Sequence, residues 1–224
     1  MEIAPWITRL PMVNGIMDPP LKAELPGKNI FHGTTTVGLI VRDAVILAAD
    51  KRATAGNLIA SRRAKKILKI TDYAALTISG LVADAQALAD TLRENARYYE
   101  IVNNKRVSIR GLATLLSNIL FSSRWYPYIV QLIVGGIDDS PRLFVLDLYG
   151  SITEERDYAS TGSGSPIALG VLEDRYREDM NIEDGVKIAY EAVKAAISRD
   201  SASGDGVDVA IISRRGYEER HIPL

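Results

Sequence analysis

The residues Thr36-Val-Gly-Leu-Ile-Val-Arg-Asp-Ala-Val-Ile-Leu-Ala-Ala49 form two apolar runs on either side of the polar pair Arg42-Asp43. Runs of this length around a two-residue break are typical of a β-hairpin, and their almost unbroken apolar character indicates that both strands are largely buried. Strands that are buried on both faces need an apolar layer on each side. The stretch therefore predicts a central hairpin in a layered protein.

Short apolar runs predict further strands on both sides of this hairpin. They lie at residues 58–61, 66–70, 74–79, 128–137, 142–148, 151–155, 207–213 and 217–222. Apolar residues at helical spacing predict a helix at 81–102, and Ser108 is a suitable N-cap for a second helix that reaches residue 125. Two more helices are predicted to begin at Ser165, which precedes a proline, and at Asn181, the last one ending near residue 199.

The order of these elements is strands, two helices, strands, two helices, strands, with links of hairpin length. Neighbouring parallel strands need helical crossovers, so this order argues against a doubly wound parallel sheet. Two antiparallel sheets packed face to face, with a helix pair on each outer surface, would bury both the strands and the apolar helix faces. We therefore predict an α/β protein (α+β) built as a four-layer α/β/β/α sandwich.

Composition is that of an ordinary globular protein. The chain has 224 residues, of which 47% are hydrophobic and 25% charged, and this length favours one domain of about 200 residues. Five of the nine prolines fall within residues 1–33, where no helical or strand periodicity is present. Residues 1–33 are therefore predicted to be an extension that precedes the domain.

Charge and residue types exclude several kinds of chemistry. The net charge of −1 gives no general attraction to nucleic acid or to an anionic membrane, so neither is expected as a partner. Without cysteine there is no disulfide, thiolate nucleophile or cysteine zinc site. The only imidazoles are those of His32, in the extension, and His221, near the C-terminus. We therefore expect neither a metal site nor a Ser-His-Asp triad.

Hydropathy gives an expectation about location. No apolar stretch approaches the roughly 20 residues that span a bilayer. The N-terminus has no basic region followed by a continuous apolar segment, so a secretory signal is not expected. A cytoplasmic location is the resulting expectation.

The small residues at 158–165 predict a loop in front of a helix. Within this loop, Gly162-Ser163-Gly164 matches the first half of the dinucleotide-binding pattern G-x-G-x-x-G/A. However, Ile167 occupies the last small position, and a second helix stands where a strand ending in an acid is needed. Nucleotide binding is therefore not favoured.

A possible nucleophile lies at Gly33-Thr34-Thr35-Thr36-Val37-Gly38, where the extension meets the first strand. Threonine favours strands, so the pattern alone favours a structural interpretation in which three threonines open a strand. The alternative is that one of these hydroxyl groups is a nucleophile. The local pattern does not decide between the two.

Seven separated segments add a resemblance. They are Gly33-Thr-Thr-Thr-Val-Gly38, Ala49-Asp-Lys-Arg52, Ala64-Lys-Lys66, Ile78-Ser-Gly-Leu-Val-Ala-Asp-Ala85, Gln131-Leu-Ile-Val-Gly-Gly-Ile-Asp138, Ala159-Ser-Thr-Gly-Ser-Gly-Ser165 and Arg199-Asp-Ser-Ala-Ser-Gly204. Through them the chain resembles a proteasome core particle β-subunit of the archaeal type, an N-terminal-threonine hydrolase, over nearly all of residues 33–222. The resemblance implies the N-terminal-nucleophile hydrolase fold, with residues 34–224 as a single catalytic domain.

The resemblance also implies a set of site residues. Residues 1–33 would be a propeptide removed by self-cleavage after Gly33, which would leave Thr34 as the N-terminal nucleophile. The family's supporting groups fall on Asp50, Lys66, Gly80, Ser163, Asp200 and Ser203, with the N–H of Gly80 as the oxyanion donor. Its pocket for the side chain before the scissile bond falls on Ala53, Ala64, Leu68, Ile78 and Val82.

Elementary chemistry supports these roles without the resemblance. A threonine hydroxyl needs a base, and a freed α-amine with a pKa of about 7.7 to 8.0 can serve as one near neutral pH. A cationic Lys66 would disfavour the ammonium form of that amine, and Asp50 would hold the lysine in place. An N–H without a neighbouring side chain, as in Gly80, can approach a tetrahedral oxyanion closely.

The implied function is that of a threonine-type endopeptidase subunit that degrades unfolded polypeptides by acyl transfer, without a metal or organic cofactor. The implied partners are other β-subunits in a ring, α-type proteasome subunits and, indirectly, an ATP-dependent regulatory particle. One alternative is a non-cutting structural β-type ring subunit that keeps its propeptide or depends on an active paralogue. A second is an N-terminal-nucleophile amidase that acts on small molecules.

Overall fold

Two five-stranded antiparallel sheets form the centre of the computed structural model, which describes residues 33–224. Residues 1–32 of the predicted extension (residues 1–33), His32 among them, lie outside the described residues. The first sheet has the order β10 (Tyr158–Thr161), β1 (Thr36–Val41), β2 (Ala44–Asp50), β11 (Val207–Ser213) and β12 (Gly216–Ile222). The second has the order β5 (Ile67–Thr71), β6 (Ala74–Gly80), β7 (Val130–Ile137), β8 (Pro141–Leu146) and β9 (Ile152–Glu155). Strands β3 (Ala53–Ala55) and β4 (Leu58–Ser61) form a separate hairpin.

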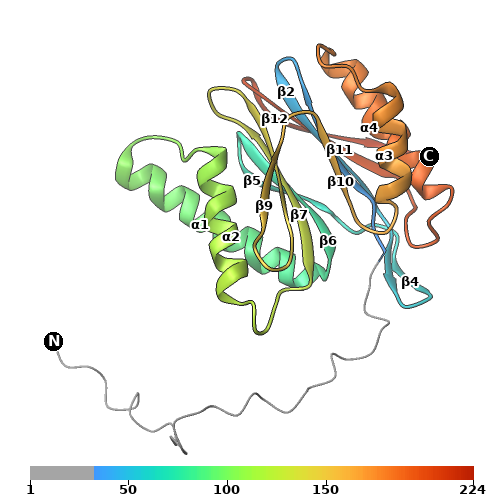
Figure 1. Ribbon diagram of the computed structural model, residues 1–224, viewed down its shortest axis with the longest axis horizontal. Helices are drawn as coiled ribbons and strands as arrows, with labels where there is room; N and C mark the ends of the chain where they lie inside the picture. Colours follow the sequence, from blue (N-terminus) through green and yellow to red (C-terminus); the bar gives the residue numbers. More distant parts are fainter. Residues whose placement is uncertain (1–32) are drawn as a thin grey trace, which may run out of the picture. The chain divides into compact units, whose positions relative to one another are not determined.

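Four helices cover the outer faces of the two sheets. They are α1 (Val82–Asn103), α2 (Ile109–Ser122), α3 (Ser165–Arg175) and α4 (Ile182–Ile197). Figure 1 shows α1 and α2 beside the second sheet and α3 and α4 beside the first. The predicted four-layer α/β/β/α sandwich is therefore confirmed. None of the helices within residues 33–224 is long and apolar enough to cross a membrane.

Strand β2 shows why the sequence requires this layering. All seven of its residues are buried, because it lies between β1 and β11 and is covered on both faces. Val45, Leu47 and Ala49 belong to the apolar cluster between the two sheets and under α1 and α2, whereas Ile46 and Ala48 belong to the cluster under α3 and α4. Alternate residues of a strand point to opposite faces, so one unbroken apolar run serves both cores.

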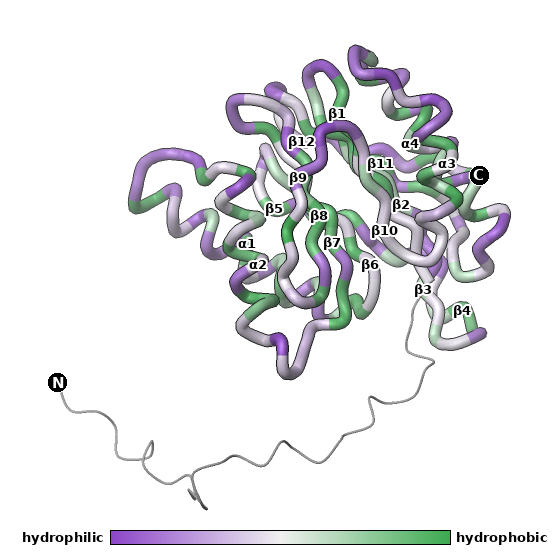
Figure 2. Tube along the Cα trace, in the orientation of Figure 1, coloured by the Kyte–Doolittle hydropathy of each residue, from purple (hydrophilic) through white to green (hydrophobic). Residues whose placement is uncertain are grey.

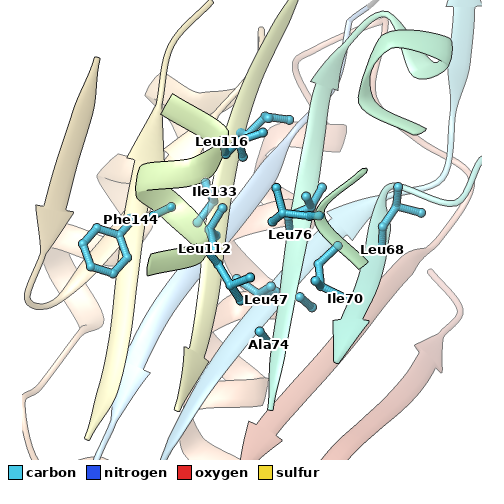
Figure 3. Close-up of a cluster of buried hydrophobic side chains, with 14 of the residues drawn as sticks. Leu47, Leu68, Ile70, Ala74, Leu76, Leu112, Leu116, Ile133 and Phe144 are labelled. Carbon is cyan, nitrogen blue, oxygen red and sulfur yellow. The ribbon is translucent and has the colours of Figure 1, made fainter. Parts of the chain in front are cut away.

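The larger cluster joins three layers. Figure 3 shows Leu47 of the first sheet near Leu76 and Ile133 of the second, with Leu112 and Leu116 of α2 in the same group. Figure 2 shows long hydrophobic stretches in the strands at the centre of the domain, whereas hydrophilic residues predominate in several of the connecting loops. This continuous core fixes the second sheet and its helices against the first.

Two local predictions were wrong. Residues 158–161 were predicted to be part of a loop, but they form β10, which pairs with β1 from Thr36↔Thr161 to Leu39↔Tyr158. The hydroxyl of Ser160 also donates to the Thr36 carbonyl oxygen at 2.7 Å. Pairing with a buried strand thus stabilises a segment whose composition favours a loop. The second helix ends at Ser122 rather than residue 125, and the short strand β3 was not predicted.

The topology brings five separate segments to one end of the sheets. Thr36 pairs with Ala49, and Asp50 pairs with Val207, so the start of β1, the end of β2 and the start of β11 are neighbours. The end of β10 lies beside the start of β1. The segment before β5 joins them through the contact between Lys66 and Asp50. All the residues of the candidate site lie at this end.

Candidate functional site

Thr34 lies just before β1 and is 3% exposed. Its N–H donates to Ser163 Oγ at 3.2 Å, and its hydroxyl donates to the carbonyl oxygen of Gly33 at 2.7 Å. The hydroxyl is therefore held against the peptide bond between residues 33 and 34. The local pattern left open whether these threonines are structural, and the structure places the hydroxyl of this one beside the peptide group that precedes it.

A buried ion pair lies next to Thr34. Lys66 Nζ donates to Asp50 Oδ1 at 2.7 Å, and both side chains are almost fully buried. The same oxygen accepts the N–H of Thr35 at 3.0 Å, while Oδ2 accepts the N–H groups of Arg52 at 3.0 Å and Gly204 at 2.9 Å. Burial lowers the pKa of Lys66 from its ordinary value, and the charge of Asp50 opposes that shift without cancelling it.

A second cluster surrounds the backbone nitrogen of Thr34. Asp200 Oδ2 accepts hydrogen bonds from Ser163 Oγ at 2.6 Å and from Ser203 Oγ at 2.7 Å. Ser203 Oγ is also 2.8 Å from the hydroxyl of Thr35. Because the carboxylate accepts both serine protons, the Thr35 hydroxyl is the donor to Ser203. The predicted Ser163, Asp200 and Ser203 are thus one hydrogen-bonded unit that contacts residue 34 through Ser163.

Glycines at positions 33 and 162 allow neighbouring segments to pack closely around Thr34. Gly162 has a φ of 94°, and a Cβ at this position would lie 2.0 Å from the carbonyl oxygen of Thr34. A Cβ on Gly33 would lie 1.7 Å from the Cβ of Ala202, in the loop between Asp200 and Ser203. The Gly162-Ser163-Gly164 segment, which resembled half of a nucleotide-binding pattern, therefore packs against the residues just before β1.

Gly80 ends β6, where its φ is 112° and a Cβ would lie 2.1 Å from the carbonyl oxygen of Ile129. No side chain fits at this position, so none covers the backbone N–H of Gly80. Within residues 33–224 no hydrogen bond joins Gly80 to Thr34, Asp50 or Asp200. The structure therefore brings together six of the seven predicted catalytic residues and places Gly80 outside their hydrogen-bond network.

The five predicted pocket residues fall into two groups. Ile78 and Leu68 are buried in the core between the sheets and under α1 and α2, at 1% and 8% exposed. Ala53, Ala64 and Val82 are half-buried. The Ile78 N–H donates to the carbonyl oxygen of Lys66 at 2.8 Å, so this strand position is fixed directly to the ion pair.

Two residues with extensive contacts were not singled out by the sequence analysis. Arg52 donates through Nε to Asp205 Oδ2 at 2.8 Å and through Nη1 to the carbonyl oxygen of Ser201 at 2.9 Å, so it holds the loop that carries Asp200. Thr35 contacts both clusters, through its N–H and its hydroxyl. Arg52 lies in Ala49-Asp-Lys-Arg52, one of the segments that carry the resemblance, whereas no sequence pattern distinguishes Thr35 from the threonines on either side of it.

His221 lies outside this site. Its Nδ1 is 2.9 Å from Asp208 Oδ1, and Lys51 Nζ is 3.2 Å from the same oxygen. Within residues 33–224 no group of three or more His, Asp or Glu side chains could hold a metal ion. The polar groups beside Thr34 are hydroxyls, two carboxylates and an amine, which suit proton transfer and acyl transfer.

Comparison with known proteins gives consistent matches. The family model described as "Proteasome subunit" matches residues 30–212. The chain is 58% identical over 221 residues to "Proteasome subunit beta 2" of Aeropyrum pernix, a match that covers 99% of this chain and 98% of that protein. It is 56% identical over 194 residues to "Proteasome subunit beta 2" of Ignicoccus hospitalis, covering 87% of this chain and 91% of that protein.

A further relative is "Proteasome subunit beta" of Methanocaldococcus vulcanius, 57% identical over 190 residues, which are 84% of this chain and 85% of that protein. The match of the family model spans most of the described domain, and the sandwich of two antiparallel sheets with flanking helices agrees with it. The chain therefore belongs to the proteasome subunit family, as a β-subunit of the archaeal type with the N-terminal-nucleophile hydrolase fold.

Proposed function

We propose that this proteasome β-subunit is a threonine-type endopeptidase whose nucleophile is Thr34, exposed by cleavage after Gly33. The observation that carries the proposal is the 2.7 Å hydrogen bond from the Thr34 hydroxyl to the carbonyl oxygen of Gly33. A nucleophile that already contacts the adjacent peptide group needs little chain movement to reach its carbonyl carbon. Residues 1–33 would then be a propeptide, and residues 34–224 the working subunit.

Self-cleavage would proceed in two steps, an acyl shift to the Thr34 oxygen and hydrolysis of the resulting ester. Thr34 Oγ1 attacks the carbonyl carbon of Gly33, the bond from that carbon to the nitrogen of Thr34 breaks, and an ester forms between Gly33 and the Thr34 oxygen. The hydroxyl proton ends on the released amine. Water then hydrolyses the ester, so that residues 1–33 leave as a carboxylic acid and Thr34 keeps a free hydroxyl and a free α-amine.

In the processed subunit the freed amine is the base. It lies where the Thr34 N–H now contacts Ser163 Oγ, so Ser163, Asp200 and Ser203 can orient it and exchange protons with it. Lys66 lies near the same position, held by Asp50, whose Oδ1 also accepts the N–H of Thr35. A cation at that place disfavours protonation of the amine and stabilises a threonine oxygen as it loses its proton. The N–H of Gly80 is proposed as the donor to the oxyanion that forms on the substrate carbonyl.

Hydrolysis of a substrate repeats the same chemistry on a second carbonyl. The threonine oxygen forms an ester with the acyl part of the substrate, the amine part leaves with the proton, and water releases the acyl part. An apolar pocket formed by Ala53, Ala64, Leu68, Ile78 and Val82 would favour Leu, Phe or Tyr before the scissile bond. Burial of such a side chain contributes roughly 1.5 to 3 kcal/mol, whereas an unpaired charge is disfavoured there.

The partner subunits proposed for this protein follow from its membership of the proteasome subunit family. Proteasome subunits assemble into a core particle, and we propose a ring of β-subunits stacked on α-type subunits, with unfolded polypeptide supplied through an ATP-dependent regulatory particle. A cytoplasmic location fits this arrangement. A structural β-subunit that does not cut would assemble in the same way, so activity and the state of residue 34 distinguish the two functions.

The nucleophile is tested by two substitutions at one position. We expect Thr34→Ala to abolish both self-cleavage and peptide hydrolysis, with a loss on the order of 10⁴ or more, because nucleophile and base act as a unit. Thr34→Ser should keep part of both activities, since a hydroxyl and an α-amine remain. Assays use assembled particles that contain no wild-type subunit, and undiminished turnover by the alanine variant would exclude Thr34 as the nucleophile.

The ion pair is tested by neighbouring lysines. Lys66→Ala should abolish hydrolysis, whereas Lys65→Ala should leave it nearly unchanged, because Lys65 is half-exposed and pairs with Glu219 instead. Loss of one partner of a buried pair costs about 3 to 5 kcal/mol of folding free energy. Thermal unfolding of Lys66→Ala and of the double variant Asp50→Asn/Lys66→Met therefore separates stability from catalysis. A double variant that is stable and fully active would show that the pair is only structural.

Gly33, the residue before the proposed cleavage site, gives a prediction that is specific to this structure. In Gly33→Ala the new Cβ meets the Cβ of Ala202 at 1.7 Å, so residue 33 or the loop at Ala202 must shift, and a shift of residue 33 disturbs the contact of its carbonyl with the Thr34 hydroxyl. We expect self-cleavage to slow by about 10²-fold, as a misplacement of about 1 Å typically does. Adding Ala202→Gly should restore part of the rate, while Ala202→Gly alone serves as the control.

The rate is measured by intact mass as a function of time after assembly. Each Gly33→Ala subunit that has been cleaved should then hydrolyse peptides at the normal rate, because residue 33 is no longer attached. Cleavage of Gly33→Ala at the wild-type rate would contradict the geometry of residues 33, 34 and 202 described above.

A further inference from the structure

A group of cationic side chains lies at the end of the sheets opposite to Thr34. Strand β6 runs from Ala74 to Gly80, at the site end, so the turn before Ala74 lies at the other end. Strand β11 starts beside Asp50 and likewise runs to Ser213 at that other end. The β5–β6 turn, the β11–β12 turn and the connection between α1 and α2 contribute to common hollows there. In Figure 2 the α1–α2 connection is coloured as hydrophilic.

Two adjoining hollows, of about 380 and 320 Å³, share Asp72, Tyr73 and Arg106 in their walls. Their charged side chains are six cations and two acids, namely Lys69, Arg93, Arg97, Arg106, Arg214 and Arg215 against Asp72 and Glu100. The chain as a whole has a net charge of −1, so this excess of positive charge is local. A local field of this kind attracts and orients an anionic partner.

Neither acid lies within ion-pair distance of a described arginine, although Lys69 and, more weakly, Arg106 lower the pKa of the Asp72 carboxyl. Asp72 pairs with Lys69, at 2.5 Å, and Glu100 accepts a hydrogen bond from the Tyr73 hydroxyl at 2.6 Å. Arg93 pairs with Asp90, on its own helix. In the described part of the chain the remaining four arginines of the two hollows have no carboxylate partner. We call these four, Arg97, Arg106, Arg214 and Arg215, the cationic cluster.

Two members of the cluster are held in place by uncharged groups. The Arg106 guanidinium lies 4.9 Å from the centre of the Tyr73 ring, and Arg214 Nη2 donates to the carbonyl oxygen of Asp139 at 2.9 Å. Tyr73 is itself fixed, at 4% exposed, and burial beside Glu100 raises the pKa of its hydroxyl so that it remains a donor. Side chains that are already positioned lose less conformational freedom when a partner binds.

We propose that the cationic cluster is a docking surface for an acidic polypeptide segment of a partner subunit. Guanidinium groups bind carboxylates through paired hydrogen bonds. The four arginines come from α1, the α1–α2 connection and the β11–β12 turn and are spread over two hollows, so they match an extended segment with several carboxylates better than one small anion. Because the surface lies at the end opposite to Thr34, docking leaves the candidate site uncovered. The inference does not depend on catalytic activity.

The test reverses charges that make no contact within the chain. Neither Arg97 nor Arg215 makes a side-chain hydrogen bond, ion pair or ring contact within residues 33–224, so Arg97→Glu/Arg215→Glu should fold normally, as thermal unfolding of the unassembled chain would verify. The matched control is Arg156→Glu/Lys187→Glu, which changes the net charge equally at two exposed residues elsewhere. Each full-length variant is produced together with the partner subunits, and native mass spectrometry measures assembly over a range of salt concentrations.

We expect the cluster variant to need at least about tenfold higher subunit concentration for assembly than the control, with a weaker dependence on salt. A labelled polyglutamate peptide should bind the unassembled wild-type chain and lose most of that binding in the cluster variant. Equal assembly of cluster and control variants at every salt concentration would overturn the proposal. Binding of a labelled oligonucleotide that is lost in the cluster variant, with assembly unchanged, would overturn it as well and would assign the surface to nucleic acid.

Discussion

The buried carboxylate of Asp50 holds the candidate site together. Its two oxygens accept four hydrogen bonds, from the Lys66 amine and from the backbone N–H groups of Thr35, Arg52 and Gly204. These donors come from the start of β1, the segment after β2, the segment before β5 and the loop after α4. A buried acceptor without partners costs about 1 to 3 kcal/mol or more when charged, so these hydrogen bonds stabilise the mutual arrangement of the four segments. The position of the Thr34 hydroxyl is a consequence of that arrangement.

The two carboxylates of the site have different surroundings and are suited to different tasks. Asp50 is buried among donors that are mostly fixed backbone groups, so it can position charge but has little freedom to rearrange. Asp200 is half-buried and contacts two hydroxyl groups, of Ser163 and Ser203, which can rotate and pass protons. Pairs of carboxylates with contrasting environments commonly divide electrostatic and proton-transfer roles in this way. Thr35 joins the two groups, because its N–H contacts Asp50 and its hydroxyl contacts Ser203.

Sequence patterns predicted the layers because β2 is apolar on both faces and the helices carry their apolar residues at regular spacing. They missed β10, since the stability of that strand comes from pairing with β1 and not from its own composition. The site was predicted only through the resemblance, because its residues lie up to 170 positions apart and periodicity does not report such contacts. The contacts of Arg52 and the clash that excludes a side chain at residue 33 depend on the path of the loop around Ala202, which required coordinates.

Whether Thr34 is an N-terminal nucleophile is tested most directly by the intact mass of this subunit within particles whose peptidase activity is measured in the same sample. We expect a chain that begins at Thr34, with activity rising in proportion to the fraction of subunits in that form. Fully active particles in which this subunit retains residues 1–33 would contradict it. So would particles that contain only this β-subunit in the processed form and hydrolyse no peptide.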